Sequence, residues 1–120
     1  MIERVWSART TREGASRYAD YFGRVVLPEL TVIAGYRGAR VLERELNGSI
    51  ELVVITRWQT LDAIRAFAGD EFDRAVVHDE AAALLTDFDR RVRHYGVVVD
   101  EALDAMTARG DALPEAEGLL

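Results

Sequence analysis

The residues best suited to chemistry in this sequence are its two histidines, His78 and His94. An imidazole takes up or releases a proton near neutral pH, so either residue could act as a general base. The chain has no cysteine, and its 15 basic residues are all arginines. This composition excludes thiolate nucleophiles, Schiff-base lysines and zinc–cysteine sites, and two histidines cannot form a histidine-rich metal site. We therefore expect no metal.

Aromatic and arginine side chains could complete a ligand site around these histidines. A tryptophan at the end of an apolar strand, beside the start of a helix, is a good candidate for a pocket wall. An inward-facing arginine or tyrosine could donate hydrogen bonds to a ligand oxygen. The candidate catalytic residues are Trp58 and His78, and the candidate substrate-binding residues are Tyr36, Arg57, Phe67, His94 and Trp6.

Each candidate also has an ordinary structural interpretation. Trp58 could be a core aromatic that anchors the following helix, and Trp6 could simply pack in the first strand. Arg57 could be solvated or paired with Glu43 or Glu51, as arginines on strands commonly are. His94 and Tyr95 point to opposite faces of one strand, so only one of them can face a cavity. The sequence leaves these alternatives open.

The element that must position these residues is the strand and helix over residues 50–69. Apolar residues occupy both faces of the strand between Glu51 and Arg57, which is typical of a strand covered on both sides. Thr60 can cap a helix that begins at Leu61, and Gly69 suits its C-terminus. The sequence therefore predicts a central strand that leads directly into an amphipathic helix.

The first half of the chain shows three further elements. Residues 2–9 alternate as a strand, and Thr10 and Glu13 have the spacing of a capping box at a helix start. The helix should continue to about residue 26 and kink or restart at Pro28. Asn47 and Gly48 tolerate positive φ, so they predict a tight hairpin between strands 36–46 and 50–57.

The second half is predicted to hold one more helix and one more strand. Asp79 can cap a helix whose buried residues recur at i, i+3, i+4 and i+7. Residues 91–99 read as the last strand, and residues 101–109 could add a short helix in the tail. The predicted buried stripe comprises Ala81, Leu84, Leu85 and Phe88.

This order of elements predicts an α+β fold, a ferredoxin-like βαβ-βαβ sandwich with a four-stranded antiparallel sheet. Helices would cover one sheet face, and the apolar residues Val5, Val53 and Ile55 would lie on the other. An uncovered face of this kind is larger than soluble monomers usually tolerate, so we expect a homodimer that closes two sheets together. Residues 1–99 would form the domain, and residues 100–120 an acidic tail.

The net charge of −6 limits the possible partners. Most of the negative charge lies after Val99, where the sequence has six acidic residues and one basic residue, Arg109. Without a basic surplus, nucleic-acid binding has little electrostatic support. No apolar run is long enough to span a membrane, and the first residues read as a strand and not as a leader. We expect a cytoplasmic protein that binds neither nucleic acid nor membrane.

Three segments carry a resemblance to a known family: GYRGARVLERE at 35–45, VVITRWQTLDAIRAFAGDEFDRAVV at 53–77 and FDRRVRHYGVV at 88–98. With them the chain resembles the antibiotic biosynthesis monooxygenases of the dimeric α+β barrel superfamily. The resemblance implies a cofactor-independent monooxygenase that oxidises an aromatic phenol or quinol with O2 in an apolar pocket. It also implies a homodimer, a small aromatic substrate, no cofactor, and a cavity role for Trp58.

Two alternatives remain on the same scaffold. The first is a non-catalytic dimeric protein that binds a ligand or serves as an accessory protein. The second is a heme-degrading monooxygenase, a branch in which a helical histidine binds iron. The resemblance places Val76 at that position and His78 two residues later, nearly on the opposite face of a helix. Ser7 is the nearest counterpart of an asparagine in that branch. Heme degradation is therefore disfavoured, and His78 is expected to be exposed or to cap a helix beside Asp79.

Overall fold

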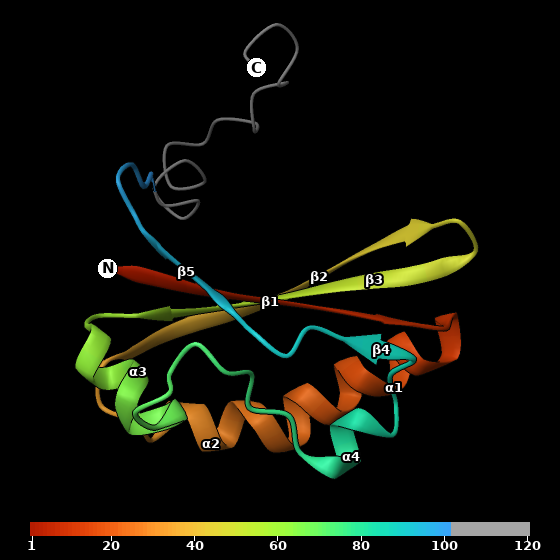
Figure 1. Cartoon of the computed structure of the whole chain (residues 1–120), viewed down its shortest axis with the longest axis horizontal. Coiled ribbons are helices and arrows are strands. Elements are labelled where there is room, and N and C mark those ends of the chain that lie inside the picture. The colour runs from red at the N-terminus through yellow and green to blue at the C-terminus, as the bar shows by residue number, and fades with distance from the viewer. Residues whose placement is uncertain (102–120) are drawn as a thin grey trace, which may run out of the picture.

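The protein forms two layers, an antiparallel β-sheet and a layer of helices on one of its faces (Figure 1). The structure is a computed structural model that describes residues 1–101. Within that range, no helix has the length and apolar character required to cross a membrane. Apart from Glu101, the predicted tail helix over residues 101–109 lies outside the described residues.

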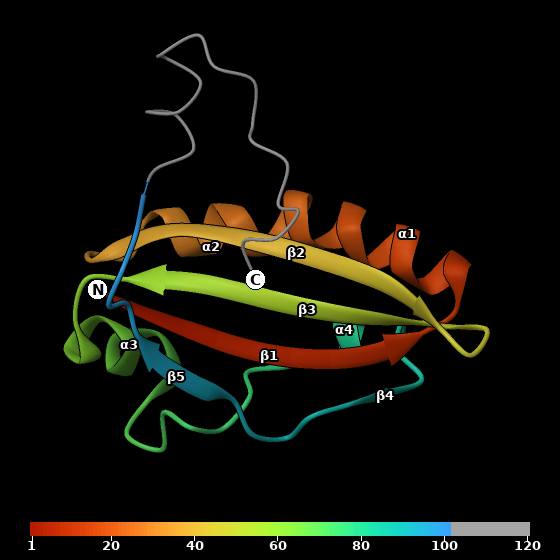
Figure 2. The ribbon, with the colours of Figure 1, turned by 90° about the horizontal axis from the view of Figure 1, so that it is seen from above.

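The sheet is centred on β1 (Ile2–Thr10), which pairs antiparallel with β3 (Ser49–Trp58) along its whole length. Outside β3 lies β2 (Tyr36–Leu46), and the far edge of β1 pairs with β4 (Asp87–Phe88) and β5 (Arg93–Gly96). The order β2-β3-β1-β4, visible in Figure 2, confirms the predicted ferredoxin-like topology.

The predicted last strand is wrong in its extent, because the fourth position of the sheet is occupied by two short strands. Between β4 and β5, the backbone turns to the loop that follows helix α3 (Leu61–Ala68). The amide of Ala75 donates to the carbonyl of Arg90, and the amide of Val92 donates to the carbonyl of Asp73. Residues 97–99 also lie beyond β5, and Val98 and Val99 are exposed. These loop hydrogen bonds replace a continuous ladder with β1.

The hairpin and the central helix form as the sequence predicts. Asn47 and Gly48 have φ values of 53° and 81°, the left-handed conformation required by a tight two-residue turn. The hydroxyl of Thr60 accepts from the amide of Ala63 at 3.1 Å and caps α3. Gly69 ends the helix with φ of 85°, a conformation that side chains other than glycine rarely adopt.

The long helix of the first half is continuous but changes its winding. It comprises α1 (Arg12–Tyr21), the π-helical turn η1 (Phe22–Val26) and α2 (Leu27–Thr31). Pro28 has no amide hydrogen to donate, and the wider turn lies directly before it. The predicted irregularity at Pro28 therefore takes the form of a π turn.

The start of this helix corrects the predicted cap by one residue. Thr11 is the N-cap, and its hydroxyl accepts from the amide of Gly14 at 3.0 Å. Thr10 belongs to β1 and is buried, and its hydroxyl donates to the carbonyl of Leu84 at 2.7 Å. The capping box with Glu13 does not form because Thr10 is used in the packing of β1.

The predicted helix over residues 79–88 is also wrong in length. Helix α4 (Asp79–Ala82) has four residues, and Phe88 lies in β4 opposite Ala8. The amides of Thr86 and Asp89 donate to carbonyls of β1, which draws this segment to the sheet edge. Pairing with β1 therefore overrides the helical pattern of the sequence.

The two faces of the sheet differ sharply in burial. On the helix side, alternate residues of β3 are buried, from Ile50 through to Trp58. On the other side, Val53 and Ile55 of β3 and Val5 of β1 are only half-buried. We predicted that both faces of β3 are covered. Within residues 1–101 only the face toward the helices is covered, and the other face is open.

Candidate active site

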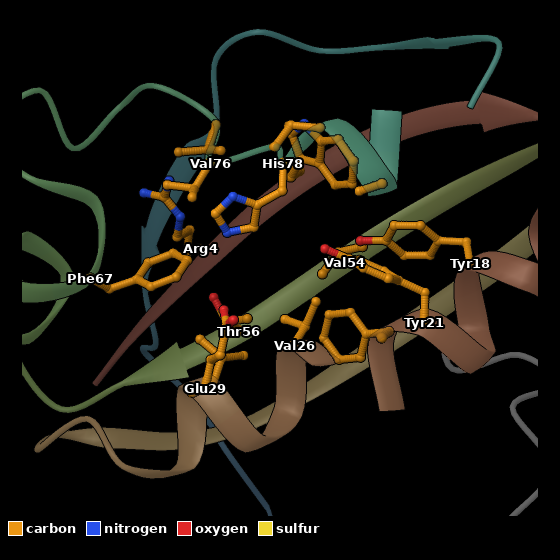
Figure 3. A pocket seen from close by; sticks show the side chains of 16 residues that line it. Arg4, Tyr18, Tyr21, Val26, Glu29, Val54, Thr56, Phe67, Val76 and His78 are labelled. Atoms are coloured by element: carbon orange, nitrogen blue, oxygen red, sulfur yellow. The ribbon is translucent and has the colours of Figure 1, made fainter. Parts of the chain in front are cut away.

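A cavity of about 80 Å³ lies between the helix side of the sheet and the helices. It is roughly half of the ~150 Å³ that admits benzene in an engineered apolar core, so a single small ring would need a modest opening. Figure 3 shows side chains converging on it from β1, β3, the long helix and the loop after α3. The wall is formed by Arg4, Trp6, Tyr18, Tyr21, Phe22, Val26, Glu29, Leu30, Val54, Thr56, Phe67, Val76, Val77, His78, Ala81 and Val92.

The most unusual wall residue is Arg4, which the candidate list from the sequence lacked. Its side chain is on the helix side of β1 and only 5% exposed. It donates through Nη1 to the carbonyl of Phe72 and through Nη2 to the carbonyl of Arg74, the latter at 2.7 Å. Its guanidinium also lies 5.5 Å from the ring centroid of Phe67. Arg4 thus connects the sheet to the loop that covers the cavity.

Burial lowers the pKa of Arg4 to about 10, and the smaller opposing influence is the negative charge of Asp73. At neutral pH the guanidinium therefore remains charged. Charged side chains are rarely buried without a charged partner, because removing an ion from water is costly. The cavity contains a permanent positive charge in an otherwise largely apolar wall.

His78 lies on the cavity wall, and its ring points into the cavity in Figure 3. The predicted capping role is wrong: His78 is the N-cap residue of α4, but its side chain makes no capping hydrogen bond. Within residues 1–101 the imidazole makes no hydrogen bond, so both ring nitrogens are available to a ligand. The residue is exposed, as the sequence predicted, so it lies at the rim of the cavity.

The prediction that His78 and Val76 lie on opposite faces of a helix is wrong as well. Residues 75–78 form no helix, and His78 has an extended backbone with φ of −76° and ψ of 157°. Side chains two residues apart lie on the same side of an extended chain. Both Val76 and His78 accordingly line the cavity.

His94 lies outside the wall but contacts Arg4. The Nη1 atom of Arg4 is 3.1 Å from Nε2 of His94, and a guanidinium can only donate, so this ring nitrogen accepts. The ring of His94 also packs against Phe72, with 5.6 Å between centroids. His94 therefore helps to fix Arg4 and is not placed to contact a ligand directly.

The stability of the protein should fall as the pH is lowered below neutrality. Burial, and secondly the charge of Arg4, lower the pKa of His94 from 6.5, against a smaller opposite effect of Asp73. Below pH 6.5 the unfolded chain takes up a proton at this position before the folded chain does, so stability decreases until the folded pKa is passed. Urea unfolding between pH 7.5 and about 5 measures the slope.

His94→Gln should flatten this slope, because an amide oxygen can accept from Arg4 without titrating. Tyr95→Phe, on the same strand at an exposed residue, is the matched control and should keep the wild-type slope. Equal slopes in His94→Gln and the wild type would contradict the assignment.

Two tyrosines provide hydroxyl groups at another part of the wall. The rings of Tyr18 and Tyr21 are 6.1 Å apart, and both residues are buried. Burial raises the pKa of Tyr18 well above 10, with a smaller contribution from Tyr21. Burial also raises the pKa of Tyr21, followed by the charges of Glu80 and Glu29. Both hydroxyls are therefore neutral hydrogen-bond donors at physiological pH.

Trp58 is not on the cavity wall, which corrects the predicted pocket role. It is fully buried, with its ring stacked on Phe67 at 5.5 Å and Tyr36 edge-on at 5.6 Å. Its indole Nε1 donates to the hydroxyl of Thr56 at 2.8 Å. Trp58 therefore lies one layer behind the wall and supports Phe67 and Thr56, which do face the cavity.

The remaining candidates are divided between the two faces of the sheet. Trp6 faces the cavity, and its Nε1 donates to the carbonyl of Asp89 at 2.7 Å. Arg57 lies on the open face, 3.6 Å from Glu3 and 2.8 Å from Asp100. The structure thus brings together Trp6, Phe67 and His78, whereas Tyr36, Arg57, Trp58 and His94 lie outside the wall.

No set of three or more potential metal ligands forms a cluster within residues 1–101. The groups available for chemistry are the charge of Arg4, the imidazole of His78 and the hydroxyls of Tyr18 and Tyr21. Such a set can bind, orient and deprotonate an aromatic molecule.

Comparison with known proteins defines the class of fold. No protein-family model and no curated protein sequence matches the chain. Among solved structures it is similar to a candidate antibiotic biosynthesis monooxygenase from Bacillus cereus, with a TM-score of 0.58 and 17% identity over 84% of this chain and 96% of that one. The chain therefore has the fold of an antibiotic biosynthesis monooxygenase, as the resemblance in its sequence implied.

The structure is also similar to MhuD. A MhuD mutant with two manganese protoporphyrin IX groups per active site has a TM-score of 0.56 and 18% identity, over 85% of this chain and 99% of that one. The heme-degrader MhuD from Mycobacterium tuberculosis, with two hemes in its active site, has a TM-score of 0.52 and 20% identity, over 85% of this chain and its own full length. At these identities the likeness defines the fold.

Proposed function

We propose that this protein is a monooxygenase that oxidises a small aromatic phenol or quinol with O2 and without a cofactor. The observation that carries the proposal is the cavity lined by aromatic side chains into which the unbonded imidazole of His78 points, on the fold of this monooxygenase group. Trp6 and Phe67 supply flat apolar surfaces for a ring, and His78 supplies the proton acceptor.

The proposed reaction needs little from the protein beyond binding and proton transfer. His78 removes the phenolic proton, and the resulting phenolate is electron-rich enough to reduce O2. A phenol and O2 then give a quinone and water, because one oxygen atom enters the ring and the other leaves with two hydrogen atoms. The substrate supplies all the electrons, and the largely apolar wall reduces the contact of the bound ring with water.

Oxygen uptake with a panel of single-ring phenols and hydroquinones tests this function. We expect at least one compound to be oxidised at a rate well above the reaction without protein. With 18O2, one labelled atom should appear in the quinone and one in water. Tight aromatic binding without oxygen uptake for any compound would instead support the alternative of a non-catalytic ligand-binding or accessory protein.

A heme-degrading activity is the second candidate, because His78 presents a free nitrogen to the cavity and MhuD shares the fold. The fit of a porphyrin is poor, however. Pockets for drug-sized ligands measure roughly 300–1,000 Å³, and this cavity measures about 80 Å³. Heme would require the loop over residues 70–78 to move away. A Soret band on heme titration that is lost in His78→Ala would favour this candidate.

We also propose that the protein acts as a homodimer through the open face of the sheet. Val5, Val53 and Ile55 form an apolar strip on adjacent strands of that face, with Leu42 beside it on β2. Exposed apolar patches of this kind commonly mark protein interfaces. A second copy would supply the missing cover.

Ile55→Arg should weaken the proposed dimer at least 100-fold, because an unpaired charge buried in an apolar interface costs about 3–5 kcal/mol. Sedimentation velocity across a range of concentrations measures the change. Val32→Arg is the control, since Val32 is 83% exposed at the end of α2 and remote from this face. A wild-type protein that sediments as a monomer at tens of micromolar would overturn the proposal.

A further inference from the structure

Arg4 carries a buried positive charge for which residues 1–101 provide no ion-pair partner. Its contacts are two backbone carbonyls, a histidine nitrogen and the face of Phe67. The carboxylate whose charge acts on it, Asp73, is itself exposed and pairs with Arg91 at 2.9 Å. Carbonyl groups offset only part of the cost of burying a cation, so the cavity wall holds an uncompensated charge.

The guanidinium also keeps hydrogen-bonding capacity. It has five N–H donors, and its hydrogen bonds within residues 1–101 use three of them. Arg4 lines the cavity, and Figure 3 shows its guanidinium close to Val76 and Phe67 at the same end. Its remaining donors can therefore serve a molecule inside.

We propose that the cavity selects an aromatic ligand that carries an ionised oxygen, a carboxylate or a phenolate, and that this oxygen pairs with Arg4. The inference deepens the proposed function, on whose cavity it rests, by assigning the charge of the substrate. An anion would supply the counter-charge that the buried guanidinium lacks and would accept its remaining hydrogen bonds. The apolar ring would lie against Phe67 and Trp6.

The other charged wall residue supports a directional arrangement. Glu29 is exposed at the rim on α2 and makes no ion pair with Arg4. A negative charge there repels an anionic group and favours its placement toward Arg4. The neutral hydroxyls of Tyr18 and Tyr21 are at a different part of the wall, where they can accept or donate to an uncharged substituent.

Binding of benzoate and benzamide to the wild-type protein tests the proposal, because the two probes match in shape and differ in charge. Quenching of tryptophan fluorescence can report binding, since Trp6 lies on the wall. We expect benzoate to bind about 10- to 100-fold more tightly than benzamide, the range typical of a hydrogen bond to a charged group. A third arm with 4-nitrophenolate distinguishes a phenolate site from a carboxylate site.

Variants separate ligand recognition from the role of Arg4 in holding the loop. In Arg4→Gln, benzoate and benzamide should bind with about equal affinity, and the affinity for benzamide should stay within a few-fold of the wild-type value. Arg4→Lys keeps the charge and should restore most of the preference. Glu29→Gln, the matched control for a charged wall residue, should keep or increase it. If Arg4 only held the loop in place, Arg4→Gln would weaken the binding of benzoate and of benzamide by the same factor.

A measurement on the wild type covers the case in which Arg4→Gln does not fold. The charges acting on His94 are Arg4 and Asp73. An anion bound to Arg4 should offset the positive charge and raise the pKa of His94 in an NMR titration, whereas benzamide should not. Equal affinity for the two probes, no binding of either, or an unchanged His94 titration with benzoate bound would overturn the proposal. Benzoate binding without oxygen uptake from any phenol would leave it standing and contradict the proposed function.

Discussion

His78→Gln is expected to lower kcat for phenol oxidation by about 10²- to 10⁴-fold, the range typical of removing a general base. Glutamine retains a polar side chain of similar size but cannot take up the phenolic proton. Because Phe67 and Trp6 still form the wall, the affinity for an aromatic ligand should change by no more than a few-fold. Oxygen uptake at saturating substrate, together with fluorescence binding, separates the two effects.

His94→Gln is the matched control for this experiment, because it alters the other histidine of the chain, which lies outside the cavity wall. Its kcat should remain within a few-fold of wild type. A full rate in His78→Gln would show that proton transfer does not depend on this residue. In that case the neutral hydroxyls of Tyr18 and Tyr21 would not replace it as bases, since burial raises the pKa of both.

The sequence predicts local structure well where the determinants are close together in the chain. The cap at Thr60, the glycine at Gly69 and the turn at Asn47 and Gly48 each depend on the conformation of one to four residues. The alternation of β1 likewise follows from neighbouring side chains. These elements therefore agree with the structure, and with them the order of the sheet.

Prediction failed where distant segments compete for the same backbone groups. Residues 84–88 were predicted to continue the helix that begins at Asp79, yet the amide of Thr86 bonds to β1, and residues 89–92 bond to β1 and to the loop over residues 73–75. The same loop is extended at His78, so an argument from helical phase gave the wrong direction for that side chain. Neither effect depends on residues adjacent in the sequence.

Arg4 was not among the site residues predicted from the sequence, although its position in the first strand gave a signal. It shares the inward face of β1 with Trp6 and Ala8, both buried, and a charged residue among apolar neighbours of that face was the available signal. Its partners, the carbonyls of Phe72 and Arg74, are about 70 residues away in the chain. Only the folded structure shows that a loop brings them to the cavity.

Trp58→Ala is expected to reduce the free energy of unfolding by about 3–5 kcal/mol, the usual cost of truncating a buried aromatic side chain. Trp58 is fully buried between Phe67 and Tyr36, so its removal leaves a void that neither ring can fill without moving. The loss is a large share of the 5–15 kcal/mol that stabilises a typical domain. Urea unfolding at a fixed protein concentration measures it.

Trp58→Phe separates this supporting role from a direct part in the chemistry. Phenylalanine keeps most of the ring packing and loses the hydrogen bond to the hydroxyl of Thr56, so the cost should be well below that of Trp58→Ala. Because Trp58 lies behind the wall and does not touch the cavity, kcat in the folded Trp58→Phe protein should stay within about tenfold of wild type. A drop in kcat as large as that of His78→Gln, with stability nearly unchanged, would place Trp58 in the reaction itself and contradict its position one layer behind Phe67.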